Sequence, residues 1–262
     1  MVKRIILIFI SLIVISCAGL TGDIAKEKSN APKENFWVTH PKSGAITIIG
    51  VSGPQLKPED EIAAALLDAA QKVSMFHGVY VKYESIENIG TRMLDYYVDS
   101  EINMVYDEQY DKYLEKLTYV KDRDILKQNN QTFVKFTYSA PFPENISYSN
   151  KRNPDGAPEW TRRPPAEING MAAGVGFARR HLRMRDTFIK SYQAAAVSIV
   201  SQTSTKITTS TSQNTSEFDN TQFIYRKSSG RLAQFIVIDT WVDPEKLDVW
   251  TLAVARVLER NR

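Results

Sequence analysis

The sequence predicts an α+β fold made of two related small units, each a mostly antiparallel sheet with one long helix packed on a face. Two observations predict this duplication. Short apolar runs that end in glycines occur at 44–53 and again at 170–177, and a helical stripe follows each of them. The second stripe, which includes Phe188, begins 126 residues after the first, which begins at Ile62. The order strand, helix, strand, hairpin is therefore expected twice.

The composition is that of an ordinary folded chain. Of the 262 residues, 43% are hydrophobic and 24% are charged, with 12 glycines and 11 prolines. These fractions exclude a collagen-like chain, a disulfide scaffold and global disorder. The formal net charge of +3 is too small for a dedicated nucleic-acid-binding protein.

The first residues read as a targeting segment. Lys3 and Arg4 precede an apolar run from 5 to 15, the pattern of a secretory signal peptide. Eleven helical residues rise only about 16 Å, which is too short for a hydrocarbon core of about 30 Å. We therefore expect residues 1–16 to be a signal peptide rather than a permanent membrane span.

The sequence Val14-Ile15-Ser16-Cys17 resembles the bacterial lipobox, and Cys17 is the only cysteine of the chain. The resemblance implies a lipoprotein signal peptide, cleavage before Cys17, and acylation of that residue, with palmitate among the fatty acids. A plain signal peptide or a short membrane helix with an incidental cysteine is the alternative. Two or more acyl chains suffice for stable membrane attachment. Residues 17–35 are small, polar or charged and predict a flexible tether.

The first α+β unit is expected at 36–150. Pro58, with Glu59, Asp60 and Glu61 after it, is a favourable start for a helix, because proline fits the first helical position and acidic groups favour the positive end. A strand at 79–83 should follow the helix. A hairpin with arms at 116–120 and 132–138 should come after it, and an insertion at 84–115 separates the strand from the hairpin. Within the insertion, 101–115 could be a helix or a long hairpin, and the helix is slightly favoured.

The second α+β unit is expected at 151–262, after a proline-rich break between Pro141 and Pro158. The Ser/Thr run at 203–212 predicts an exposed or edge strand, although a flexible linker has the same composition. Alternating apolar runs at 235–241 and 249–254, joined by a polar turn, predict the closing hairpin.

The duplicated pattern resembles a family. The stretches Ala172–Gly176, Ala194–Ala196 and Ile238–Asp243, together with the lipobox, look like the bacterial outer-membrane surface-antigen lipoprotein family (Lpp-twenty type), which includes the flagellar P lipoprotein. The resemblance implies an outer-membrane lipoprotein with a scaffolding or assembly role around envelope structures, flagellar assembly among them, and no catalytic residues. Members often carry one unit, whereas this chain has two and the 84–115 insertion.

A basic cluster is the best candidate ligand-binding surface. Arginine side chains bind phosphate and carboxylate groups through paired hydrogen bonds, so the cluster could bind an anionic envelope ligand such as peptidoglycan or lipid A. The alternative is a solvated surface on which nearby acidic residues balance the positive charge, with no ligand. The six arginines of the cluster are Arg162, Arg163, Arg179, Arg180, Arg183 and Arg185.

A tyrosine-rich stretch is the candidate protein interface, because tyrosine supplies rigid contact area with a polar tip. Amphipathic packing under the insertion is the alternative. The interface residues chosen are Tyr96, Tyr97, Tyr106, Tyr110 and Tyr113.

Together these features predict a non-enzymatic envelope lipoprotein. Its expected partners are the lipid bilayer through acylated Cys17, envelope proteins or a second copy of the chain, and peptidoglycan, with no nucleic acid. With one cysteine and three histidines, no metal centre or cofactor is expected. The first alternative function is anionic-ligand binding through Arg162–Arg185, and hydrolase activity is the least favoured. The outer membrane is the preferred location.

Overall fold

The computed structural model describes most of the chain after the predicted tether. Cys17, the predicted signal peptide (1–16) and the predicted tether (17–35) lie outside the described residues, and so does Tyr96. Residues from Asn35 to Arg262 form one compact unit. The described residues are 36–39, 44–89, 97–121, 123–142, 146–203, 205–213 and 220–258.

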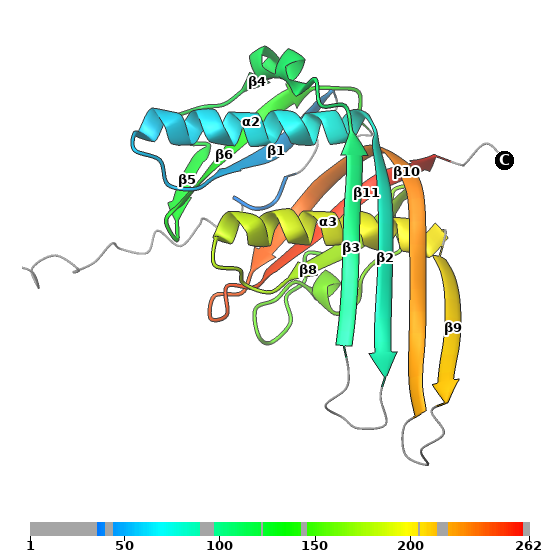
Figure 1. Ribbon diagram of the computed structural model, residues 1–262. Coiled ribbons are helices and arrows are strands. Elements are labelled where there is room, and N and C mark those ends of the chain that lie inside the picture. Colours follow the sequence, from blue (N-terminus) through cyan, green and yellow to red (C-terminus); the bar gives the residue numbers. More distant parts are fainter. Residues whose placement is uncertain are drawn as a thin grey trace, which may run out of the picture. The chain divides into compact units, whose positions relative to one another are not determined.

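The fold is α+β with antiparallel sheets, as the sequence predicted (Figure 1). In the smaller sheet, β6 pairs with three other strands, all antiparallel, and helix α2 packs on β1 and β6. The strands are β1 (Ala45–Ser52), β4 (Leu117–Thr118), β5 (Ile125–Gln128) and β6 (Gln131–Ser139), and α2 is Pro58–His77.

The larger sheet has the order β3-β2-β10-β11-β8-β7, with β9 also paired to β10. Helix α3 (Met184–Thr203) packs mainly on β8 and β11. The strands are β2 (Val79–Ile89), β3 (Tyr97–Tyr106), β7 (Glu167–Ile168), β8 (Met171–Ala178), β9 (Thr205–Gln213), β10 (Asn220–Val242) and β11 (Val249–Leu258).

The two halves share a pattern of strand pairing. In the first half, β1 precedes α2 and pairs antiparallel with β6; in the second, β8 precedes α3 and pairs antiparallel with β11. Both helices begin on the left-hand side of Figure 1 and run in the same direction. Lys72 of α2 lies over the ring of Tyr192 of α3, 5.6 Å from its centre, so the two helices are in contact through side chains.

The sheets do not divide where the sequence suggested a boundary, between residues 150 and 151. Strands β2 and β3 come from the first half, yet β2 pairs with β10 over eleven residue pairs of the larger sheet. Burial explains this arrangement, because Val79 and Val81 of β2 share a core cluster with Leu232 and Phe235 of β10. The first half therefore contributes strands to both sheets.

Two further expectations can be compared with the structure. The helix favoured for 101–115 is wrong in its first part, because β3 continues to Tyr106 and only a 3₁₀ helix, η1 (Tyr110–Lys116), follows. Ile102, Met104 and Tyr106 alternate with exposed residues, which is the period of a strand. The Ser/Thr run forms β9, so the strand expectation is confirmed over the linker alternative. A second 3₁₀ helix, η2, covers Glu159–Thr161.

Candidate functional site

A cleft of about 680 Å³ lies where connecting segments from both halves meet. Four segments form it: the β1–α2 loop, the two-residue β5–β6 turn, the β8–α3 loop with the first turn of α3, and the β10–β11 loop. Each half therefore contributes one strand-to-helix loop and one hairpin turn. The lining residues are Gly53, Pro54, Gln55, Asn129, Asn130, Gln131, Arg180, His181, Leu182, Arg183, Met184, Arg185, Asp186 and Leu247.

The two turns that line the cleft have unusual backbone conformations. Asn129 and Asn130 have φ angles of 51° and 56°, and Gln128 pairs with Gln131, so they form a two-residue hairpin turn of the type that requires positive φ at both positions. Asparagine tolerates this conformation better than most residues. Leu247, with φ of 58°, is less suited to it, and its side chain packs against the core cluster that contains Trp37.

The β8–α3 loop is positioned by its backbone, which leaves the arginine side chains outward. The Arg180 N–H donates to Asp248 Oδ1 at 2.9 Å, and the His181 N–H donates to Thr187 Oγ1 at 2.9 Å. The side chains of Arg180, Arg183 and Arg185 are exposed. Among the ion pairs within 4.0 Å in the described residues, none involves these three arginines.

The structure divides the arginine cluster into two groups. Arg180, Arg183 and Arg185 line the cleft, whereas Arg162, Arg163 and Arg179 do not. Arg162 forms an ion pair with Asp155 at 2.7 Å, and Arg163 lies 3.8 Å from Glu159. Along the chain, strands β7 and β8 lie between these two residues and the cleft arginines. The cleft therefore brings together three of the six predicted residues, and the other three lie outside its lining.

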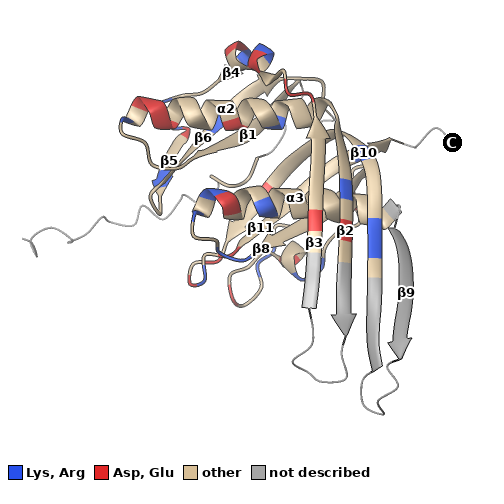
Figure 2. Cartoon of the chain, viewed as in Figure 1, with Lys and Arg blue, Asp and Glu red and all other residues tan. Residues whose placement is uncertain are grey.

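The beginning of α2 carries its own negative charge, in contrast to the β8–α3 loop (Figure 2). Glu61 accepts hydrogen bonds from Lys127 Nζ and Thr132 Oγ1, both at 2.7 Å. These two hydrogen bonds, with Lys127 first, lower the pKa of Glu61. Because this carboxylate is already engaged, it does not pair with the cleft arginines.

Gln131 adds an unused acceptor beside the cleft. Its side chain is only 8% exposed, and its Nε2 donates to the Asn130 carbonyl at 2.9 Å. Its Oε1 is buried and has no hydrogen-bond partner in the described part of the chain. A Cβ placed on Gly53 would lie 3.8 Å from this oxygen, so the oxygen is next to the cleft wall. A buried acceptor without a partner is costly unless a donor approaches it.

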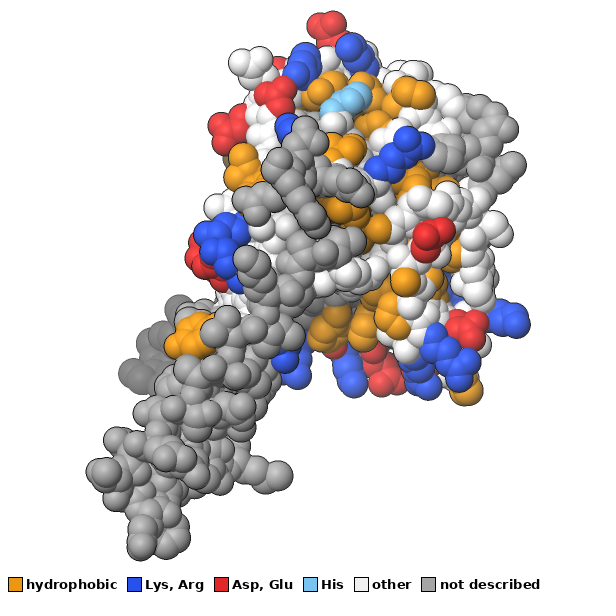
Figure 3. All heavy atoms as spheres, turned by 90° about the vertical axis from the view of Figure 1, so that its right-hand side faces the viewer, with side chains coloured by type: hydrophobic (Ala, Val, Ile, Leu, Met, Phe, Trp, Pro, Cys, Tyr) orange, Lys and Arg blue, Asp and Glu red, His pale blue; other side chains and the backbone are white. Residues whose placement is uncertain are grey.

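On the side of the molecule that faces right in Figure 1, the charge distribution is different. Figure 3 shows basic and acidic side chains intermixed there among hydrophobic ones, in the part that the structure describes. The cleft instead contains three arginines, one histidine and a single acidic residue, Asp186. The cleft is therefore suited to a ligand with negative charge.

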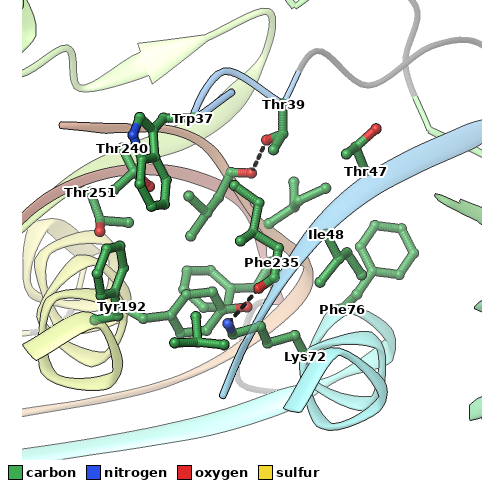
Figure 4. Close-up of a pocket in the computed structure, with 15 residues that line it drawn as sticks. Trp37, Thr39, Thr47, Ile48, Lys72, Phe76, Tyr192, Phe235, Thr240 and Thr251 are labelled. Atoms are coloured by element: carbon green, nitrogen blue, oxygen red, sulfur yellow. Dashed lines mark hydrogen bonds between the residues drawn. The ribbon is translucent and has the colours of Figure 1, made fainter. Parts of the chain in front are cut away.

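A second cavity lies in the interior between the two helices and the sheets (Figure 4). Its walls are mainly apolar and include Trp37, Tyr192 and Phe235. Lys72 supplies the one charged side chain of the lining, and its Nζ already contacts Asp68 Oδ2 and the Ile49 carbonyl, both at 2.7 Å. The volume of about 40 Å³ admits only a few water-sized molecules, so this cavity is a packing feature.

Asp239 is the most deeply buried carboxyl group in the described residues, and it lines neither cavity. Asp239 is 1% exposed, and its Oδ2 accepts a hydrogen bond from Trp160 Nε1 at 2.9 Å. Burial raises the pKa of Asp239 to about 6, although hydrogen bonds from Trp160, the Thr240 N–H and Tyr148 act in the opposite direction. The hydrogen bond from Trp160 joins β10 to η2, which is a structural role.

The tyrosines expected to form an interface are mostly packed against the body. Tyr113 is 7% exposed and belongs to the main core, which corrects the surface role expected for it. Tyr106 and Tyr110 are partly buried and pack against core clusters. Tyr97 lies on β3. For the described tyrosine side chains, the structure favours amphipathic packing over a free contact surface.

Comparisons with known proteins add no relative. No protein-family model matches the chain, and neither curated proteins nor solved structures give a match. The resemblance to the surface-antigen lipoprotein family therefore stays a prediction. Within the described residues, no cluster of histidine, cysteine and acidic side chains could hold a metal ion. No helix in that same part of the chain is long and apolar enough to cross a bilayer.

Several cleft residues did not emerge from the sequence. Asn129 and Asn130 signal a turn, but nothing local shows that the turn faces a loop more than fifty residues further along. Leu56 and Leu182 carry a signal that could have been used, because they are 126 residues apart, the same spacing as the helical stripes.

Proposed function

We propose that this chain is a lipid-anchored envelope protein whose folded body binds an anionic ligand in the cleft. The observation that carries the proposal is the position of Arg180, Arg183 and Arg185, which line one 680 Å³ cleft without an acidic partner in the described residues. A guanidinium group binds phosphate or carboxylate through paired, charge-assisted hydrogen bonds. Three unpaired guanidinium groups around one cleft are suited to lipid A phosphates or to peptidoglycan carboxylates.

The chain contains its own control for this proposal. Replacing Arg180, Arg183 and Arg185 with alanine removes three positive charges that line the cleft. Replacing Arg162, Arg163 and Arg179 with alanine removes the same charge outside it. A hydrogen bond to a charged group contributes about 1.5–3 kcal/mol, so the cleft variant should bind at least about tenfold more weakly.

The experiment uses the detergent-solubilised full chain in calorimetric titrations with inorganic pyrophosphate and with a peptidoglycan stem peptide. Pyrophosphate represents phosphate ligands and the stem peptide represents carboxylate ligands. We expect one of the two probes to bind the parent and the Arg162/Arg163/Arg179 variant equally. The same probe should bind the Arg180/Arg183/Arg185 variant much more weakly. Equal binding by the two triple variants, or no binding by the parent to either probe, would reject the cleft as the site.

A scaffolding role through protein contacts is the second candidate function. Strand β3 favours it, because β3 ends the larger sheet and Val105 on it is more than half exposed. A strand at a sheet edge offers backbone groups to another chain. Self-assembly would give a concentration-dependent mass in analytical ultracentrifugation, and a Val105→Lys variant should weaken it. A strictly monomeric parent at high concentration would exclude self-assembly.

A further inference from the structure

Two leucines protrude from the loops that border the cleft. Leu56 and Leu182 are each 102% exposed. Leu56 follows cleft residue Gln55 in the β1–α2 loop, and Leu182 lines the cleft in the β8–α3 loop. They are 126 residues apart, so they occupy equivalent positions in the two halves. A single exposed leucine is ordinary, but a repeated pair beside one cleft indicates a surface used in contact.

The charges around these leucines are basic on the α3 side. Arg180, Arg183 and Arg185 flank Leu182 within three residues, and all three are exposed. Near Leu56 the charge is mixed, because Lys57 follows it directly and the acidic Glu59 and Asp60 come shortly after. Apolar side chains among exposed basic groups are the composition of surfaces that rest in the interface of an anionic bilayer, where the apolar groups enter and the basic groups meet phosphates. A water-soluble polymer would satisfy the arginines but would offer no apolar phase to the leucines.

The start of the described chain lies at the same end of the body. The Trp37 ring stacks on Phe188 with centres 5.4 Å apart and meets the edge of Phe133 at 4.8 Å. Phe188 comes four residues after Met184, and Phe133 comes two residues after Gln131. Met184 and Gln131 both line the cleft. The chain therefore enters the body next to the cleft.

The predicted tether makes this position significant. Eighteen residues separate Cys17 from Phe36, and a flexible chain of that length has an average end-to-end distance of about 25 Å. An acyl group on Cys17 would hold the entry point, and with it the cleft and both leucines, within reach of the bilayer. The opposite end of the body would be further away: Leu258 comes nine residues after Val249 on β11, about 30 Å along the strand.

From these three observations we infer that the loop end, defined as residues 53–57, 129–131 and 180–186 with Leu247, docks on an anionic bilayer. Leu56 and Leu182 enter the interfacial layer, and Arg180, Arg183 and Arg185 bind the phosphates of lipid headgroups. This inference rests on the proposed function and names its ligand as a lipid surface with phosphate headgroups. The lipid anchor and the loop end then contact the same membrane.

The test places a polarity-sensitive fluorophore at single positions of the mature acylated protein. Cys17 is the only cysteine, and acylation blocks its thiol, so Leu56→Cys, Leu182→Cys and Leu258→Cys each supply one labelling site. Leu258 is the matched control, a leucine that is 44% exposed at the far end of β11. The labelled proteins are incorporated into vesicles of phosphatidylcholine alone or with phosphatidylglycerol, some of them containing brominated lipid as a quencher.

We expect a several-fold rise in emission, with quenching by brominated lipid, at positions 56 and 182 in phosphatidylglycerol vesicles. The rise should be much smaller in phosphatidylcholine and absent at position 258. Adding Arg180→Ala, Arg183→Ala and Arg185→Ala should abolish it, while Arg162→Ala, Arg163→Ala and Arg179→Ala should not. Circular dichroism confirms that every variant is folded.

Labels at 56 and 182 that stay as exposed to water as the label at 258 would overturn the docking inference. A rise of equal size in both kinds of vesicle would overturn the role of anionic headgroups. Failure of the proposed function is distinguishable, because it is measured without vesicles. If the cleft variant loses stem-peptide binding while labels at 56 and 182 stay in water, the cleft binds a polymer and the docking inference alone is wrong.

Discussion

Gly50 of β1 lies against Ala65 of α2 so closely that a Cβ added to the glycine would come within 2.0 Å of the Ala65 carbonyl oxygen. The relationship recurs 126 residues later, where a Cβ on Gly176 would lie 1.9 Å from the Ser191 carbonyl oxygen. Only a residue without a side chain permits such an approach of strand and helix. The two halves therefore share not only an order of elements but the same point of closest contact.

Gly50→Ala and Gly176→Ala should each destabilise the fold, because the new methyl group forces the helix away from the strand. Overpacking of this kind costs about 1–3 kcal/mol. Gly78→Ala is the control, since a Cβ there would meet nothing within 4 Å and its φ of 168° is extended. Urea unfolding measures all three. A Gly50→Ala midpoint equal to that of Gly78→Ala would contradict the close contact.

Asp68 connects α2 to β1 in the first half only. Its Oδ2 accepts from the Val51 N–H at 2.9 Å and from Lys72 Nζ at 2.7 Å. Asp68→Ala leaves both donors without this acceptor. Removing one partner of a buried ion pair costs about 3–5 kcal/mol of stability. Adding Lys72→Met to Asp68→Ala should recover part of the loss. A double-mutant cycle by urea unfolding checks this, and strictly additive effects would mean that the pair is not coupled.

The β5–β6 turn should be sensitive to residue type. Asn129 and Asn130 both have positive φ, which costs most residues about 1–2 kcal/mol. Replacing both with alanine should therefore lower the thermal midpoint, whereas replacing both with glycine should preserve or slightly raise it. Calorimetric melting compares the two variants directly. If the double alanine variant has the same thermal midpoint as the double glycine variant, the turn is not of the type described.

The contribution of Asp239 to the free energy of unfolding should fall as pH rises from about 4 to about 6. Its folded pKa of about 6 exceeds the ordinary value of 3.8, so the folded state binds more protons in this window and loses stability as they leave. About 2 pKa units correspond to roughly 3 kcal/mol. Asp239→Asn should remove this dependence.

Urea unfolding at several pH values gives the difference between parent and Asp239→Asn. Asp60→Asn, which removes an exposed carboxylate, is the control variant. A difference between the parent and Asp239→Asn that does not change between pH 4 and 6.5 would show that Asp239 ionises normally in the folded protein.

Local features of the fold could be read from the sequence, and distant partners could not. Pro58 and the acidic residues after it correctly located the beginning of α2, because helix-start signals act over one turn. The spacing of 126 residues between the two helical stripes could also be read from the sequence, and Gly50 and Gly176 have the same spacing. The pairing of β2 with β10 was missed, because alternation identifies a strand but carries no information about its neighbour.

In the candidate site, too, local features could be predicted from the sequence and contacts between distant segments could not. Arg180, Arg183 and Arg185 were chosen from the sequence together with three other arginines, because all six lie within 24 residues. Arg162 and Arg163 were grouped with them by nearness along the chain, but neither lines the cleft. Asn130 and Gln131 reach the cleft from the other half, and only the packing of the two halves reveals that.

The 23-residue strand β10 has a consequence for how the chain folds during synthesis. Its partner β2 begins about 140 residues earlier, at Val79, so β2 and β3 remain a hairpin with an open edge until the last quarter of the polypeptide has been made. Contacts between such distant segments form slowly, and an open edge invites association with other chains. The nascent protein is thus kept from completing its structure early, and its dependence on chaperones should be greatest while β10 is still missing.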